Sequence, residues 1–187
     1  EIQQNGTPDI EFAATGLLAR NYLASGQPGN ARRALESLRA RLVDQGHTRF
    51  LPNMDAALCR IALHTGDLDS ADAWYREKAP RDPMHLNVMK RYQYLTQAQV
   101  ELADGTPEAA LLTLAPLGPY CESCFRYIDG IHVDTLTALA LYRMRREGWQ
   151  EKLTRAMTTA AEFGFIRTLS VYGAAILPLL AELPWTG

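Results

Sequence analysis

The chain has 187 residues and a formal net charge of -2, and 47% of its residues are hydrophobic while 21% are charged. This composition is typical of a folded domain, and the charge argues against direct contact with nucleic acid, which requires a basic excess. No segment reaches the ~18 uncharged apolar residues of a membrane span, and three cysteines do not make a disulfide framework.

Apolar residues recur with the period of a helix along the whole chain, and no stretch alternates as a strand does. We therefore predict an all-α protein with helices at residues 9–25, 29–45, 50–65, 68–79, 84–104, 107–116, 120–147, 149–163 and 165–182. The chain begins with Glu1 and shows no signal sequence. We therefore expect it to be a fragment of a larger cytoplasmic protein.

A repeat of about 40 residues organises these helices into antiparallel pairs. The first stretch of each pair ends at a glycine, and these glycines lie 40, 39 and 43 residues apart, at Gly26, Gly66, Gly105 and Gly148. Glycine at the end of a helix adopts the left-handed conformation at no steric cost. Because one such pair cannot bury its apolar face alone, the pairs should stack as a solenoid. We predict one domain over residues 1–187, with pairs at about 9–45, 50–79, 84–116 and 120–163 and a closing helix at 165–182.

Polar residues that follow these glycines predict where the second helix of a pair begins. Asp67 is a good N-cap candidate. Thr106 offers a cap, with Pro107 at the first helical position and Glu108 near the positive end of the helix dipole.

The repeat resembles a known family. A glycine, an alanine five residues later and then a large apolar residue, as in residues 66–75, resemble the tetratricopeptide (TPR) signature. The period here is nearer 40 than the ~34 residues of that repeat. Longer repeats of this kind resemble the sensor domain of MalT-like, LuxR-family ATP-dependent transcription regulators. Two stretches carry this resemblance: residues 94–117, and residues 160–169 followed by Leu177-Pro178-Leu179-Leu180.

The resemblance implies a right-handed TPR-like α-solenoid that receives a small-molecule effector or a protein partner and has no catalytic activity. In that family, ATPase and DNA-binding domains flank the solenoid. Neither is expected in this fragment, because the chain has no Gly-x-x-x-x-Gly-Lys-Ser/Thr loop and nothing after Trp185 that could read DNA. The alternative is a free-standing TPR-like scaffold that binds an acidic peptide through Arg20 and Arg60.

The first helix of each pair lines the concave face of a TPR-like solenoid, which predicts a ligand-binding groove. Positions six and thirteen residues before the repeat glycines should project into it. From these positions we select Arg20, Asn53, Arg60, Tyr92, Gln99 and Tyr142 as the predicted ligand-binding residues. Guanidinium groups and tyrosine rings could hold an acidic peptide, a phosphate or a sugar. The alternative is a solvated groove, or arginine–acid pairs within the repeat.

Cys121-x-x-Cys124 raises the question of a metal or redox site. Structural zinc needs four ligands, and His132 alone follows nearby. No strands are predicted that would support a redox fold. A metal protein built on this pair stays a third hypothesis, but we expect small buried thiols and neither metal nor cofactor. Because no catalytic motif is present either, we predict that the fragment is not an enzyme.

Overall fold

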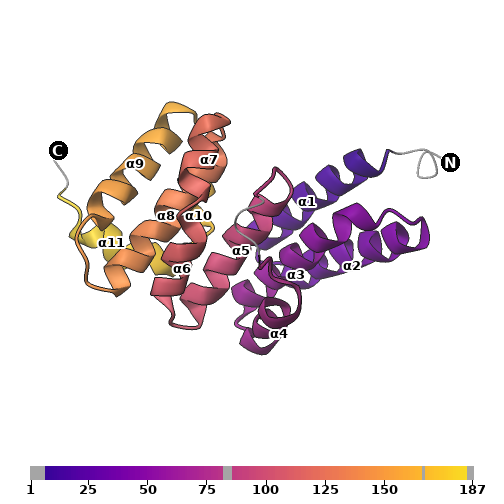
Figure 1. Cartoon of the computed structure of the whole chain (residues 1–187). Helices are drawn as coiled ribbons and strands as arrows, with labels where there is room; N and C mark the ends of the chain where they lie inside the picture. The colour runs from indigo at the N-terminus through magenta and orange to yellow at the C-terminus, as the bar shows by residue number, and fades with distance from the viewer. Residues whose placement is uncertain (1–6, 82–85, 166, 185–187) are drawn as a thin grey trace. The chain divides into compact units, whose positions relative to one another are not determined.

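The computed structural model describes residues 7–81, 86–165 and 167–184, and every regular element in these ranges is a helix (Figure 1). The all-α prediction is therefore confirmed. No helix among the described residues is long and apolar enough to cross a membrane. The chain divides into two compact units, unit 1 (Glu1–Pro80) and unit 2 (Arg81–Gly187). The predictions of a single domain and of a right-handed superhelix concern both units together, and they stay predictions.

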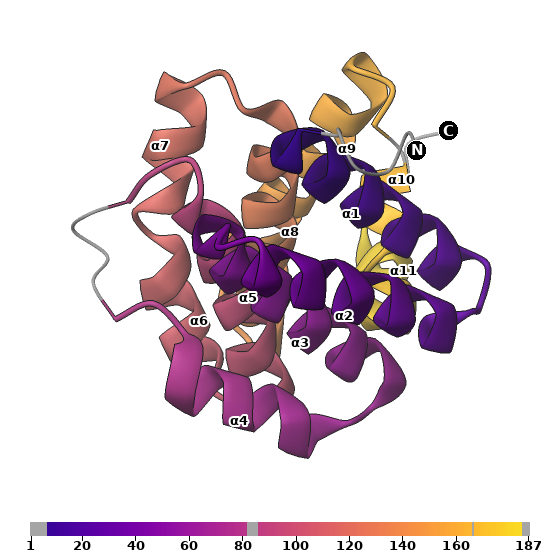
Figure 2. The same cartoon turned by 90° about the vertical axis from the view of Figure 1, so that its right-hand side faces the viewer.

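Unit 1 consists of two antiparallel helix pairs. Its elements are α1 (Pro8–Ala24), α2 (Pro28–Asp44), the short 3-10 helix η2 (Thr48–Phe50), α3 (Leu51–Thr65) and α4 (Leu68–Lys78). Figure 2 shows α1 and α2 side by side, and α2 also packs against α3. The core includes Leu35, Leu38 and Leu42 from α2 together with Met54 and Ile61 from α3. The predicted helices agree with these bounds to within one or two residues.

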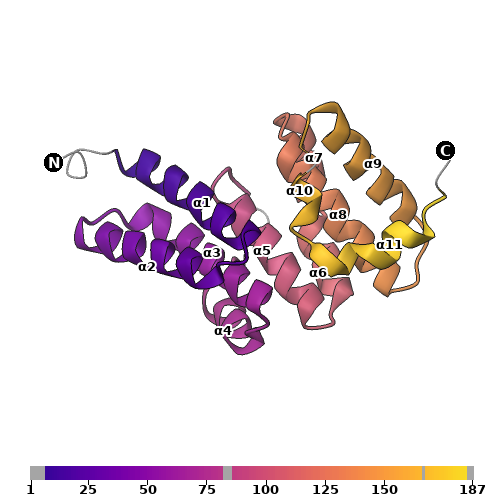
Figure 3. The ribbon, with the colours of Figure 1, turned by 180° about the vertical axis from the view of Figure 1, so that it is seen from behind.

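Unit 2 contains two further pairs and a closing segment. Its elements are α5 (Lys90–Ala103), α6 (Pro107–Leu114), α7 (Leu117–Ser123), α8 (Tyr127–Arg143), α9 (Trp149–Glu162), α10 (Arg167–Ser170), the 3-10 helix η4 (Gly173–Ile176) and α11 (Leu177–Glu182). One apolar cluster joins Leu114 and Leu117 to Leu136, Leu153 and Leu179. The closing segment crosses the unit in front of α8 in Figure 3 and contributes Leu179 to this core.

Two predicted helices in this part of the chain are each divided in the structure. The predicted helix at 120–147 is divided between α7 and α8, and α6 and α7 follow one another end to end (Figures 1 and 2). Pro116, between α6 and α7, has no N–H to donate, so the helical hydrogen-bond ladder is interrupted there. The break between α7 and α8 lies at Phe125, which has a left-handed φ of 53°. The predicted helix at 165–182 is divided into α10, η4 and α11, and Gly173, the first residue of η4, has a φ of 50°.

The helix predicted at 84–104 begins later than expected. Its first two residues, 84 and 85, lie outside the described residues, and α5 begins at Lys90. The side chain of Asn87 accepts hydrogen bonds from the backbone N–H groups of Met89 and Lys90, both at 3.0 Å. These bonds satisfy N–H groups at the start of the helix, as an N-cap does.

The cap predictions for the second helices are confirmed in part. The Asp67 Oδ1 atom accepts from the Ser70 N–H at 3.1 Å, which caps α4. Hydrogen bonds to the side chain and then to the backbone of Ser70 lower the pKa of Asp67. Pro107 begins α6 as predicted. Thr106 does not cap this helix, because its hydroxyl donates instead to the carbonyl of Glu101 at 2.9 Å.

The same left-handed turn ends most of the helices in both units. Positive φ values recur at intervals of 19 or 20 residues within each unit, at Gly26, Gly46 and Gly66, and at Gly105, Phe125, Arg145 and Gly164. The Gly105 N–H bonds to the Leu102 carbonyl at 3.2 Å and the next N–H bonds to the Glu101 carbonyl at 2.9 Å. This is the Schellman arrangement, which satisfies the last carbonyl groups of a helix.

These turns correct the predicted register of the fourth repeat. The left-handed residues that end the first helices are at positions 26, 66, 105 and 145, which are 40, 39 and 40 residues apart. Arg145, with a φ of 54°, therefore takes the place that the sequence analysis gave to Gly148. Gly148 is instead the residue that precedes α9. The prediction was wrong because glycine is preferred in this conformation but is not required for it.

Candidate functional site

Unit 1 contains three of the predicted groove residues, and they differ in their exposure to solvent. Arg20 on α1 is exposed and Arg60 on α3 is half-buried. Asn53, on the same helix, is buried, with 6% of its surface exposed. Asn53 is therefore not presented on a surface that a ligand would meet, whereas Arg20 and Arg60 are at least partly accessible.

Unit 2 contains the other three predicted residues. Tyr92 and Gln99 are half-buried on α5. The hydroxyl of Tyr142, on α8, donates to Glu182 Oε1 at 2.5 Å, and this bond raises the pKa of Tyr142. The Tyr142 ring also meets the Trp149 ring edge-on at a centroid distance of 5.2 Å.

The corrected register separates Tyr142 from the groove face. Counted from Arg145, the position equivalent to Gln99 is Leu139, which is buried in the core. Tyr142 is instead equivalent to Leu102, three residues before the turn. Its inclusion in the site was therefore an error of register. The predicted groove as a whole involves both units and stays a prediction.

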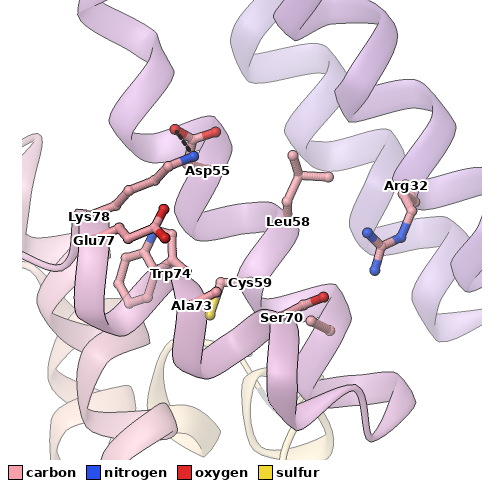
Figure 4. Close-up of a pocket in the computed structure, with 10 residues that line it drawn as sticks. Arg32, Asp55, Leu58, Cys59, Ser70, Ala73, Trp74, Glu77 and Lys78 are labelled. Carbon is pink, nitrogen blue, oxygen red and sulfur yellow. Dashed lines mark ion pairs between the residues drawn. The ribbon is translucent and has the colours of Figure 1, made fainter.

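A groove of about 220 Å³ lies within unit 1 between α3 and α4 (Figure 4). Its apolar lining includes Leu58, Cys59 and Ala62 from α3 and Ala73 and Trp74 from α4. Polar and charged side chains complete the lining: Arg32, Asp55, Ser70, Glu77 and Lys78. In Figure 4, Arg32 lies on one side of the groove, while Asp55, Glu77 and Lys78 lie together on the other. None of these residues was among the predicted site residues.

An ion-pair network lies at the end of the groove that Asp55, Glu77 and Lys78 form. Asp55, on α3, is mostly buried and accepts from Arg39 Nε on α2 at 2.8 Å and from Lys78 Nζ on α4 at 3.1 Å. Because one carboxylate bonds to both neighbouring helices, the network holds the walls of the groove at a set separation. A mostly buried charge with two such partners is stabilised in place.

The Trp74 side chain lines the groove and carries an unsatisfied hydrogen-bond donor. Trp74 is 5% exposed, and its indole Nε1 is buried without a hydrogen-bond partner among the described residues. A buried donor left unpaired costs about 1–3 kcal/mol. A carbonyl, hydroxyl or carboxylate oxygen that reached this N–H would remove that cost. With its apolar lining and its charged ends, the groove is suited to a small ligand that is partly apolar and partly polar.

The cysteine thiols do not supply a nucleophile to this groove. Burial raises the pKa of Cys59 to about 12, and the nearby charge of Arg60 only partly offsets the effect. Burial and then the charge of Asp129 raise the pKa of Cys121 to about 11. Both thiols are therefore protonated and unreactive at neutral pH.

The two thiols of Cys121-x-x-Cys124 lie in different environments. Cys121 is buried in the core, as expected, but Cys124 is exposed, so the expectation of two buried thiols was wrong. Cys124 is exposed because α7 ends at Ser123 and leaves it in the turn. Within the described part of the chain, no group of three or more histidine, cysteine or acidic side chains could hold a metal ion.

Comparison with known proteins decides the family. The family model of the MalT-like TPR region matches residues 1–184. The chain belongs to this family. No curated protein and no solved structure matches the chain.

Membership of the MalT-like TPR region confirms the resemblance inferred from the repeat and the closing segment, and with it the TPR-like helical fold. Sequence reasoning nevertheless missed Asp55, Trp74 and Lys78. One available signal was the register: Asp55 stands eleven residues before Gly66, and Asp134 stands eleven before Arg145. The 43-residue spacing derived from Gly148 concealed this equivalence.

Proposed function

We propose that this chain is the regulatory sensor domain of a MalT-like, LuxR-family transcription regulator, that it binds an effector, and that it has no catalytic activity of its own. The observation that carries this proposal is the match to the MalT-like TPR region over residues 1–184. The parent protein would act in the cytoplasm. Its ATPase and DNA-binding domains would lie in segments outside this chain.

The α3–α4 groove is the proposed effector site within unit 1. The unpaired indole N–H of Trp74 supports it, because a ligand atom that accepted a hydrogen bond from this N–H would gain binding free energy. The charged and hydroxyl side chains that line the groove would orient a polar ligand. The Asp55 network would limit the rearrangement needed for binding, which favours affinity.

A second candidate function is the binding of an acidic peptide. Arg20 and Arg60 stand at the same position of successive repeats within unit 1, six residues before Gly26 and Gly66. Both side chains are at least partly accessible. Two guanidinium groups repeated in this way would favour a ligand that carries carboxylates, with an affinity that weakens as salt rises.

The experiment is a thermal-shift screen of the chain against oligosaccharides, acidic metabolites, nucleotides and short acidic peptides. A ligand that binds the native state at 100 times its Kd adds about 2.7 kcal/mol to the free energy of unfolding. Trp74→Phe keeps an aromatic ring and removes the N–H, so it should weaken a ligand of the groove roughly tenfold, as the loss of one hydrogen bond does. Leu112→Ala, on an exposed position of α6, is the matched control.

The outcomes separate the two candidate sites. A small-molecule hit that Trp74→Phe weakens and Arg60→Glu leaves unchanged supports the groove. A peptide hit with the opposite pattern supports the arginine site. If no small molecule or peptide raises the melting temperature, the effector-binding proposal for this chain fails. A full-length protein without an ATP-binding loop and a helix-turn-helix domain would overturn the assignment to a regulator.

A further inference from the structure

The outer face of α1 is apolar and open to solvent. Ile10, Leu17 and Leu18 are 66%, 58% and 44% exposed, and Ala14 between them is also exposed. Residues 12–19 contain no charged side chain. The acids Asp9 and Glu11 do not shield this face, because they pair with Arg49 and Arg41 within unit 1.

The same positions are covered one repeat further along the chain. Counted from the left-handed turns at Gly26 and Gly66, Ile10 corresponds to Phe50, Ala14 to Met54 and Leu18 to Leu58. Phe50 and Met54 are buried, and all three residues pack in the cluster that contains Leu35, Leu38 and Leu42 of α2. This face of a first helix therefore receives the second helix of the preceding pair.

Unit 2 repeats this arrangement independently. Counted from Arg145, Val133 and Leu136 on α8 correspond to Ala14 and Leu17 on α1. Both are buried, in the cluster that contains Leu114 of α6 and Leu117 of α7. These two helices together form the second helix of the preceding pair. Two covered examples on one chain thus define what the open face of α1 is shaped to receive.

We propose that the exposed face of α1 is a docking surface for the second helix of another TPR-like helix pair. The apolar positions of such a helix fall at intervals of four, three and four residues, as the buried Ala31, Leu35, Leu38 and Leu42 of α2 do. A terminal repeat that ends a solenoid normally has a polar outer face, which α1 lacks. A second copy of this chain that met the first about a two-fold axis would bring α1, a first helix, to this face.

The test adds a further helix pair in the register that the repeat predicts. Residues 7–50 are duplicated and joined ahead of Glu11, so that the Phe50 of the copy takes the place of Ile10. A thiol probe is introduced as Leu17→Cys on a Cys124→Ser background, because Cys59 and Cys121 are buried. Leu112→Cys, 77% exposed on α6, is the control position. Circular dichroism confirms that the added residues are helical.

Docking should slow the reaction of the Leu17→Cys thiol with an aromatic disulfide reagent at least tenfold in the extended chain. The rate at Leu112→Cys should stay the same. Equal rates at Leu17→Cys in the extended and original chains, with the added pair folded, would overturn the proposal.

An independent measurement leaves the chain unextended. A helix-stapled peptide of residues 28–44 is added, and it should slow labelling of Leu17→Cys but not of Leu112→Cys. The same peptide with Leu35→Asp and Leu38→Asp should have no effect. If neither the peptide nor the added pair slows labelling of Leu17→Cys, the proposal is wrong. A concentration-dependent dimer of the original chain that Leu17→Asp dissociates would also overturn it, because a second copy would then be the occupant.

Discussion

Asp55 in unit 1 and Asp134 in unit 2 stand at the same place in the repeat, eleven residues before the turn that ends their helix, and they are held in different ways. Asp55 accepts from Arg39 on α2 and Lys78 on α4. Asp134 is held by Arg155 on α9, which bonds to both of its carboxylate oxygens. In the first arrangement the carboxylate is paired with cations from two helices, and in the second with a cation from one helix. The difference shows that a repeat can keep a buried acid while it changes what that acid connects.

The turns of the two units differ in a similar way. Unit 1 uses Gly26, Gly46 and Gly66 at its left-handed positions, whereas unit 2 places Phe125 and Arg145 at two of its own. An L-residue in this conformation costs roughly 1–2 kcal/mol more than glycine does. The hydrogen bonds of the turn are nevertheless formed at both positions, at 2.8–3.2 Å. The backbone of the repeat is thus kept in unit 2 at some expense of stability.

The largest difference between the units is expected in thiol reactivity. Cys59 in unit 1 has a pKa raised to about 12 by burial, and in unit 2 Cys121 has one raised to about 11 while Cys124 is exposed. At pH 8, iodoacetamide should modify Cys124 more than ~100-fold faster than the other two thiols, because little of either is thiolate. Peptide mass spectrometry measures the three rates. Rapid modification of Cys59 would contradict the packing of unit 1, and Cys124→Ser should remove the fast phase.

Removal of one cation should affect the two acids unequally. Arg155→Ala leaves Asp134 buried, and no other ion pair among the described residues replaces it. We expect a loss of about 2 kcal/mol, less than for a fully buried pair because Arg155 is half-exposed. Lys78→Ala should cost below about 1 kcal/mol, since Arg39 still holds Asp55. Urea unfolding followed by circular dichroism measures both. Equal losses would mean that the two acids are held in equivalent ways.

Glycine at the left-handed positions of unit 2 should remove the backbone strain that distinguishes its turns from those of unit 1. Arg145→Gly and Phe125→Gly should each raise the free energy of unfolding by about 1 kcal/mol, because both relieve a left-handed L-residue. Gly105→Ala should lower it by about the same amount, since a Cβ there meets open space and the cost is confined to the backbone. Thermal unfolding compares the three variants. A fall in the melting temperature of Arg145→Gly would show that the Arg145 side chain contributes more than its backbone costs.

The smallest effect concerns an ion-pair cluster at the start of α8. Burial alone would raise the pKa of Asp129, but the hydrogen bond from Arg126 and the charge of Arg91 outweigh it, so the pKa is lowered. The stabilisation is therefore complete above the unfolded value of ~3.9 and is lost as the pH falls through the lower folded value. Below pH ~4, the stability of the wild type should fall more steeply than that of Asp129→Asn. If the free energy of unfolding fell equally steeply with pH in both proteins, Asp129 would not contribute to the loss of stability in acid.

Part of the candidate site was recoverable from the sequence, and part was not. Arg20 and Arg60 follow from counting back from Gly26 and Gly66, because both glycines do end their helices. The Asp55–Lys78 pair joins residues 23 positions apart on two helices, and no local pattern connects them. Trp74 could be assigned to the packing of its helix, but its unpaired N–H depends on which acceptors surround it.

The sequence by itself determined the helical class, the pairing of helices and most of the helix ends, because periodic apolar residues, prolines and glycines act over a few residues and need no distant partner. Three outcomes depended on tertiary structure. The division of the predicted helix at 120–147, the left-handed Arg145 and the burial of Asn53 each reflect packing against other helices. Local preferences of about 1 kcal/mol per residue decide where a helix can end, and the larger energies of burying a side chain decide where it does end and which polar groups stay at the surface.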